Sequence, residues 1–324
     1  MDRSHWSSPL RGVFAVTAAL SCTAAPPVAR RVNGDVQHGS AVVAPVDPVR
    51  FGGRFPAAPG RHRATLTVAG EDRDVALVVP EERSEHPPLL LMLHGTGGDG
   101  AGVIDECGAL GLSHTQGAVI AAPDARVMSA PDWDHPEASN ERWWQTHPDH
   151  DPDSNADLLL VRAVISAARR DYGVDPAKVY VMGHSNGAFF ALDVAMTLGD
   201  RISGVAFNSG GLVRCPTTGG CHFRAGRVAN CGSYPAMPGW CRCEGPSLPL
   251  AVSSSARRFP VMISHGTDDP DVSVQYACEL ERALRDQGFA VTLQLRPGDG
   301  HFCDSDFAER SWRVLTGNRI AALE

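Results

Sequence analysis

The stretch Val179–Ala195 constrains the fold of this chain more than any other. A short apolar run rich in β-branched residues leads into Gly183-His184-Ser185-Asn186-Gly187, and an apolar helical pattern follows at once. This order predicts a strand, a sharp turn and a helix with Ser185 at the apex, the setting in which a G-x-S-x-G pentapeptide exposes a nucleophilic serine. Glycines at 183 and 187 suit a turn where strand and helix pass too closely for side chains. The alternative is a serine in an ordinary strand-to-helix turn.

The other apolar runs alternate between strand-like and helix-like patterns. Alternating strands and helices predict an α/β fold whose central sheet is mostly parallel and carries helices on both faces. The first helix is expected to open with a capping box of Ser154 and Asp157. The expected strands are 64–69, 74–79, 89–93, 119–122, 204–208, 260–264 and 290–295, and the expected helices are 156–172, 273–287 and 307–315.

The N-terminus predicts export. Residues 1–25 combine two arginines with a short apolar segment typical of a secretory signal, and Ala19-Leu20-Ser21-Cys22 resembles a lipobox that would attach a lipid to Cys22. Residues 26–60 are rich in Pro, Ala and Gly and are expected to form a linker, so the folded domain is expected over 61–324. The protein is therefore expected to be secreted or extracytoplasmic, with membrane contact only through an anchor at Cys22. The alternative is an apolar N-terminal strand of a cytosolic protein.

The net charge of −8 and the lack of a basic run argue against a nucleic-acid partner. The nine cysteines leave an even eight once Cys22 is assigned to the export segment. In an exported protein such a set predicts a disulfide framework, here stapling an insertion at 212–250. A zinc site with His222 is the competing chemistry, but the paired C-x2-C knuckles of structural zinc sites are missing. The eight are Cys107, Cys215, Cys221, Cys231, Cys241, Cys243, Cys278 and Cys303.

A serine nucleophile needs a base and a carboxylate that orients the base. His301, which follows a glycine in the loop after the last expected strand, is the candidate base; His265 is its rival. The candidate carboxylates are Asp268, Asp269 and Asp271, which share one loop.

The oxyanion of an acyl transfer needs backbone N–H donors. We expect one at Asn186, directly after the nucleophile, and the other at Thr96 in the glycine-rich loop after the third expected strand, with Gly97 as the alternative. Trp143, Trp144 and His184 are candidates for lining the substrate site, and the alternative for the tryptophans, Trp133 included, is loop packing. The alternating acids around Asp151 lack the glycine and distal glutamate of a calcium loop, so we expect no metal and no cofactor.

Four motifs resemble the exported α/β-hydrolase esterases of the polyhydroxybutyrate depolymerase and feruloyl or acetylxylan esterase type. The resemblance implies the α/β-hydrolase fold, and the pattern His-Gly-Thr-x-Asp implies Asp269 as the carboxylate. In that fold the loops of the acid and the base adjoin, so we expect a Cys278–Cys303 disulfide, with Cys107 bonded to the 215–243 cluster. The motifs are Leu93-His-Gly-Thr-Gly-Gly98, Tyr172–Gly187, His265–Pro270 and Gly300-His301.

The expected function is therefore that of an exported serine esterase acting on small-molecule or polymeric esters of the feruloyl, acetyl or hydroxyalkanoate type, with Ser185, His301 and Asp269 as the triad. A polyhydroxyalkanoate depolymerase or a peptidase on the same fold is the alternative. A non-catalytic binding protein is disfavoured because the chain carries a complete set of Ser, Asp and His.

Overall fold

The computed structural model describes residues 52–128, 141–146, 153–212, 231, 250 and 257–317. The expected export signal with Cys22, most of the linker, most of the 212–250 insertion, Trp133 and His222 lie outside these residues. No helix among those described is long and apolar enough to cross a membrane.

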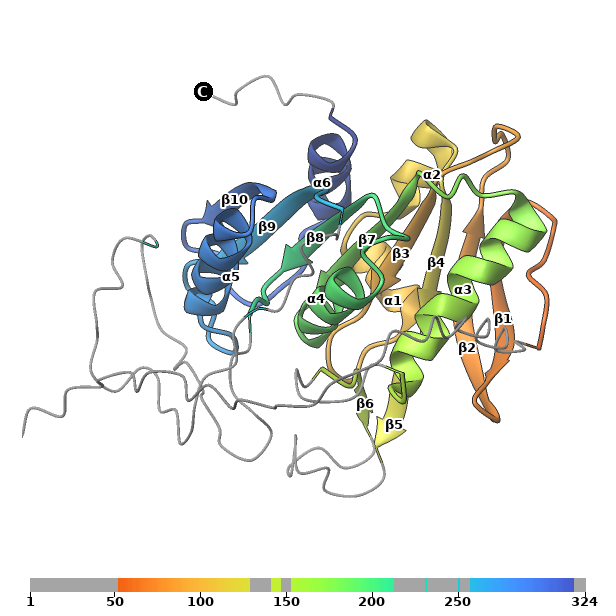
Figure 1. Cartoon of the computed structure of the whole chain (residues 1–324), viewed down its shortest axis with the longest axis horizontal. Coiled ribbons are helices and arrows are strands. Elements are labelled where there is room, and N and C mark those ends of the chain that lie inside the picture. The colour runs from red at the N-terminus through yellow and green to blue at the C-terminus, as the bar shows by residue number, and fades with distance from the viewer. Residues whose placement is uncertain are drawn as a thin grey trace, which may run out of the picture. The chain divides into compact units, whose positions relative to one another are not determined.

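An eight-stranded sheet forms the centre of the described domain (Figure 1), in the order β1-β2-β4-β3-β7-β8-β9-β10. β1 and β2 form an antiparallel hairpin, β2 pairs antiparallel with β4, and every other pair in the sheet is parallel. The predicted mostly parallel sheet is thereby confirmed. Its strands are β1 (Gly60–Val68), β2 (Glu71–Val79), β3 (Leu89–Leu93), β4 (Val119–Pro123), β7 (Val179–His184), β8 (Gly204–Asn208), β9 (Pro260–Gly266) and β10 (Ala290–Arg296).

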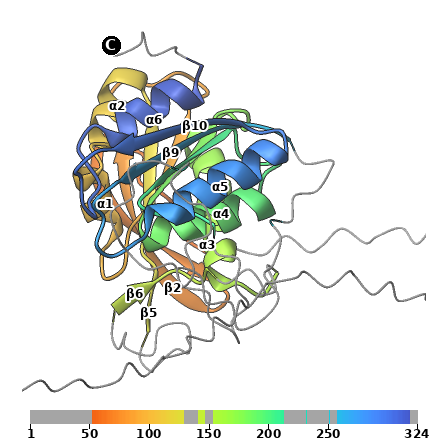
Figure 2. The ribbon, with the colours of Figure 1, turned by 90° about the vertical axis from the view of Figure 1, so that its left-hand side faces the viewer.

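Helices cover both faces of the sheet, as predicted. Figure 2 shows α3, α4 and α5 on one face and α1, α2 and α6 on the other, and each group packs on its own cluster of buried side chains. The helices are α1 (Gly100–Glu106), α2 (Leu110–Gln116), α3 (Ala156–Tyr172), α4 (Asn186–Thr197), α5 (Val274–Asp286) and α6 (Phe307–Leu315).

β3 illustrates why a strand inside this sheet is a continuous apolar run. Leu89, Leu91 and Leu93 pack into the core under α3 and α4, while Leu90 and Met92 pack into the core on the opposite face. All five side chains are fully buried. Each contributes roughly 1.5–3 kcal/mol relative to an exposed side chain, so both helical layers stabilise the same strand.

Several short elements were not predicted from the sequence. α1 and α2 have seven residues each, and α1 opens with Gly100 because a side chain there would meet the carbonyl oxygen of Ala122 at 2.0 Å. Helices this short depend on tertiary packing more than on propensity. A separate two-stranded ribbon of β5 (Arg126–Met128) and β6 (Glu141–Trp143) lies between β4 and α3 in the sequence.

Two details at the ends of α3 differ from expectation. Asn155, not Ser154, caps the helix, and its side chain accepts hydrogen bonds from the N–H groups of Asp157 and Leu158.

The packed fold also begins upstream of residue 61. Phe55 is buried, donates its N–H to Asp171 and stacks on Tyr172 at the end of α3.

The expected disulfide pairing is wrong. Cys107 is bonded to Cys303, and Cys231 to Cys278. Cys278 lies in α5 on one face of the sheet, whereas Cys303 packs with the core on the opposite face, beside the end of α1. The sheet therefore separates the two cysteines that were expected to pair. The expectation that the 215–243 cluster pairs outside itself is confirmed at Cys231.

We predict that Cys107→Ala with Cys303→Ala lowers the melting temperature by roughly 5–15 °C, because a native disulfide typically contributes about 2–4 kcal/mol and a domain of this size loses a few degrees per kcal/mol. Thermal unfolding followed by circular dichroism measures this shift. Peptide mapping of the non-reduced wild type is the companion measurement, and a Cys303 peptide linked to Cys278 would contradict the observed pairing.

Candidate active site

The predicted site residues lie where parallel strands end. His94 to Thr96 follow β3, Ser185 follows β7, Asp269 lies in the loop after β9 and His301 in the loop after β10. Carboxyl ends of neighbouring parallel strands meet at one edge of a sheet, which is the usual ligand-binding edge of an α/β fold.

Ser185 stands at the apex of the predicted sharp turn, with φ 54° and ψ −124°, a conformation that few non-glycine residues adopt. The flanking glycines are required by the close approach of backbone. A side chain at Gly187 would meet the carbonyl oxygen of Leu93 at 2.2 Å, and one at Gly183 would meet that of Gly187 at 2.2 Å. The steric reason given for these glycines is therefore confirmed.

The imidazole of His301 bridges the other two predicted residues. Its Nε2 lies 2.8 Å from Oγ of Ser185, and its Nδ1 lies 2.8 Å from Oδ2 of Asp269. An ionised carboxylate only accepts hydrogen bonds, so Nδ1 carries the proton and Nε2 of the neutral ring is left to accept the serine hydroxyl proton.

Asp269 is the one of the three candidate carboxylates that contacts His301. Its Oδ1 accepts the N–H groups of Asp271 and Val272, and Nε2 of His265 lies 3.3 Å from its Oδ2. Burial opposes the charge, but hydrogen bonds from His265, His301 and Val272 outweigh burial and hold the pKa of Asp269 well below its ordinary value. His265 therefore lies behind the carboxylate rather than beside Ser185.

Asn186 and Thr96 stay the candidates for the two backbone N–H donors near Ser185. Asn186 is the first residue of α4, so its N–H is one of those that the helix leaves unpaired. Gly97 donates its N–H to the carbonyl of Arg142, which removes it as the alternative donor. Within the described residues, no acceptor pairs with the N–H of Thr96, and the neighbouring Gly95 lies against Ser185.

The two tryptophans differ in their surroundings. Trp144 is only 2% exposed; it stacks on Phe190 with ring centroids 4.9 Å apart and donates Nε1–H to the carbonyl of His94. The expectation that Trp144 lines the substrate site is therefore wrong, and loop packing is its role. Its backbone N–H also donates to Oδ1 of Asn186, which ties this loop to the start of α4. Trp143 is half-buried and stays a candidate for contact with substrate.

Two histidines beside the site are held neutral. Burial and the nearby His301 lower the pKa of His184 to about 4, and its ring centroid lies 5.1 Å from that of His301. Burial also lowers the pKa of His94, whose Nε2 accepts the N–H of Ala125. A neutral ring at His184 adds no positive charge next to His301.

Among the described residues, Asp269, Asp271 and His301 form the one cluster whose ligand atoms lie close enough to hold a metal, within 4.8 Å of one another. Asp269 and His301 already use these atoms on each other, on Ser185 and on backbone N–H groups. Of the alternating acids near Asn155, Asp157 forms a buried ion pair with Arg73.

Two residues that support the site, Asn208 and Arg296, were not predicted from the sequence, and a third, His265, was expected only as a rival base. His265 contacts the carboxylate, while Asn208 and Arg296 contact the loop that carries His301. Asn208 and Arg296 are the last residues of β8 and β10. Polar residues that end buried parallel strands were the signal that could have revealed them.

The chain matches the model of the Esterase family, described as "Putative esterase", over residues 67–316. It is 31% identical over 212 residues to "Putative esterase NocK" of Nocardia uniformis subsp. tsuyamanensis, a match covering 62% of this chain and 56% of that protein. It is 25% identical over 140 residues to poly(3-hydroxyalkanoate) depolymerase C of Paucimonas lemoignei, a match covering 43% of this chain and 32% of that protein. The chain thus spans about half the length of the first relative and about a third of the second.

A solved structure supports the fold. LpqC, a poly(3-hydroxybutyrate) depolymerase from Bordetella parapertussis, aligns with 82% of this chain and 92% of its own, with a TM-score of 0.55 and 16% sequence identity. From the parallel sheet, the strained serine turn and the family match, we conclude that the chain has the α/β-hydrolase fold and belongs to the Esterase family.

Proposed function

We propose that this protein is an exported serine esterase that hydrolyses carboxylic esters through an acyl-enzyme. The observation that carries the proposal is the imidazole of His301, which lies 2.8 Å from both Oγ of Ser185 and Oδ2 of Asp269. A serine hydroxyl becomes an effective nucleophile when a base, itself oriented by a carboxylate, can accept its proton. Membership of the Esterase family supports the ester bond as the target.

In the first half of the reaction, Oγ of Ser185 attacks the ester carbonyl carbon while His301 takes the hydroxyl proton on Nε2. Asp269 holds the imidazole in the required tautomer and stabilises its positive charge. The N–H groups of Asn186 and Thr96 donate to the oxyanion that forms on the former carbonyl oxygen.

In the second half, the tetrahedral intermediate collapses. The bond from the carbonyl carbon to the alcohol oxygen breaks, Nε2–H of His301 protonates that oxygen, and the acyl group stays on Ser185. Water then attacks the acyl carbon and gives a proton to Nε2 of His301. The bond from the acyl carbon to Oγ of Ser185 breaks, Oγ takes that proton from His301, and the acid leaves.

Two observations bear on export and on the substrate. The disulfides Cys107–Cys303 and Cys231–Cys278 support an oxidising compartment. Similarity to a poly(3-hydroxyalkanoate) depolymerase favours hydroxyalkanoate esters, and polyester hydrolysis is the second candidate function. Assays of the purified protein on feruloyl, acetyl-xylan, short acyl and poly(3-hydroxybutyrate) substrates distinguish these ester classes.

Ser185→Ala is expected to abolish ester hydrolysis without unfolding the protein, because triad removal leaves only about 10³–10⁴-fold acceleration over water. Steady-state hydrolysis of the best ester measures the loss, and a fluorophosphonate probe should label the wild type at Ser185. Ser166→Ala is the matched control, because it makes the same substitution in α3, a helix that carries none of the three triad residues. Turnover of Ser185→Ala within about tenfold of wild type would refute the proposal, since a triad deletion costs far more.

Asp269→Asn is expected to lower kcat by about 10⁴-fold, because the amide would leave the imidazole in the wrong tautomer. Asp268→Asn and Asp271→Asn are matched controls from the same loop and should retain most activity. A larger loss at either control than at Asp269 would show that the carboxylate is assigned to the wrong residue.

The neutral state of His184 gives a test of the site's electrostatics. Its folded-state pKa of about 4 lies below the ordinary value, so the unfolded chain binds this proton first as the pH falls. Stability is therefore lost between about pH 6.5 and pH 4, by roughly 3 kcal/mol at the low end. Urea unfolding across this range should show a smaller loss in His184→Asn than in wild type, whereas exposed His114→Asn should follow wild type. An equal loss in wild type and His184→Asn would contradict the neutral assignment.

A further inference from the structure

Asn208 ends β8 at the point where the serine turn meets the loop of the base. It is fully buried, and in the sheet it lies between His184 of β7 and Ser264 of β9. Its backbone carbonyl accepts the N–H of Ser185 at 2.9 Å. This hydrogen bond holds the backbone of Ser185 against the end of β8.

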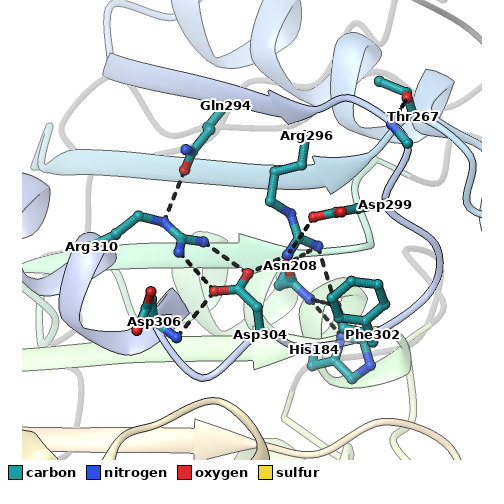
Figure 3. A network of polar contacts seen from close by, with 11 residues as sticks. His184, Asn208, Thr267, Gln294, Arg296, Asp299, Phe302, Asp304, Asp306 and Arg310 are labelled. Atoms are coloured by element: carbon teal, nitrogen blue, oxygen red, sulfur yellow. Dashed lines mark hydrogen bonds and ion pairs between the residues drawn. The ribbon is translucent and has the colours of Figure 1, made fainter. Parts of the chain in front are cut away.

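The side chain of Asn208 reaches the base loop as well (Figure 3). Its Nδ2 donates to the carbonyl of Phe302 at 3.0 Å and lies 2.8 Å from Nδ1 of His184. The orientation of the amide follows from Arg296, which can only donate and which faces Oδ1 at 3.4 Å. Nδ1 of His184 accordingly accepts, and the proton of this neutral ring is on Nε2.

Charged groups hold the same loop next to Asn208 (Figure 3). The guanidinium of Arg296 donates to the carbonyl of Phe302 at 3.2 Å and pairs with Asp304. Asp304 in turn accepts two hydrogen bonds from Arg310, at 2.7 and 2.9 Å. The carbonyl of Phe302, the residue after His301, thus accepts hydrogen bonds from two side chains. One is Asn208 at the end of β8, and the other is Arg296 at the end of β10.

We propose that Asn208 is a positioning residue that sets the distance between Ser185 and His301. The proposal rests on the proposed function of these two residues. One asparagine fixes the nucleophile through its backbone and the base loop through its amide, so the two reacting groups share one buried anchor. The amide supplies two N–H donors, one for Phe302 and one for His184. Aspartate has nearly the same shape and supplies neither.

Misplacement of His301 should affect its two proton transfers unequally. A displacement of about 1 Å can cost about 10²-fold in rate. An alkoxide is a poor leaving group that needs a proton from His301, whereas a nitrophenolate leaves with little help. Loss of the anchor should therefore penalise alkyl esters more than nitrophenyl esters of the same acid, which a general loss of stability would not do.

The test compares kcat/KM of Asn208→Asp and wild type on an ethyl and a nitrophenyl ester of the same acid. We expect a fall of about 10²-fold on the ethyl ester and of about tenfold on the nitrophenyl ester. Ser203→Ala is the matched control, because Ser203 is a buried residue directly before β8, away from Asn208 at its end, and its Oγ donates to the carbonyl of Ala177. It should lower the melting temperature and leave both kcat/KM values near wild type.

Values of Asn208→Asp within about threefold of wild type, or equal losses on the two esters, would overturn the proposal. If Asn208→Asp does not fold, Asn208→Ser, which keeps one donor, must still lose more on the ethyl ester. The result is separable from the proposed function, because active Ser185→Ala would refute the triad, whereas inactive Ser185→Ala with unaffected Asn208 variants would refute the anchor alone.

Discussion

The structure of the site depends on holding one imidazole between two groups that are distant in sequence. His301 contacts Asp269, 32 residues earlier, and Ser185, 116 residues earlier. Both contacts are hydrogen bonds at 2.8 Å, so neither loop can shift by much without breaking one of them. The parallel sheet brings these loops together, because β7, β9 and β10 end at the same edge.

The loops of the acid and the base are also joined directly. The N–H of Asp268 donates to the carbonyl of Asp299, and the N–H of Gly298 donates to Oγ1 of Thr267. Gly266 is needed at the end of β9 because a side chain there would meet the carbonyl of Asp299 at 2.3 Å. The expected proximity of these loops is thus real, although hydrogen bonds and close backbone packing produce it rather than a disulfide.

Arg296 and Asp304, near His301, are paired with opposite charges, whereas His184 is neutral. The side chain of Arg296 is 9% exposed, and a buried cation is tolerated only when it is paired. Burial opposes the charge of Asp304, but Arg310 and Arg296 outweigh burial and keep the pKa of that carboxyl below its ordinary value. His184, whose ring centroid lies 5.1 Å from that of His301, stays neutral. The paired ions therefore fix the loop, and the neutral ring leaves the base free of a second positive charge.

Local sequence signals determined the strand-turn-helix at Ser185, the mostly parallel sheet and the long helices. Steric demands at Gly183 and Gly187, and the apolar periodicity of segments such as Leu89–Leu93, act over a few residues and can be read along the chain. A motif implied that His301 contacts Asp269 rather than Asp268 or Asp271, but the contact itself depends on three-dimensional geometry. Only the tertiary structure decided the disulfide partners, the burial of Trp144 and the contacts of Asn208 with both Ser185 and the loop of His301. Each of these features depends on which segments the fold brings to the same face of the sheet or to the same group of loops. Contacts between segments that are distant in the sequence leave no periodic pattern in it.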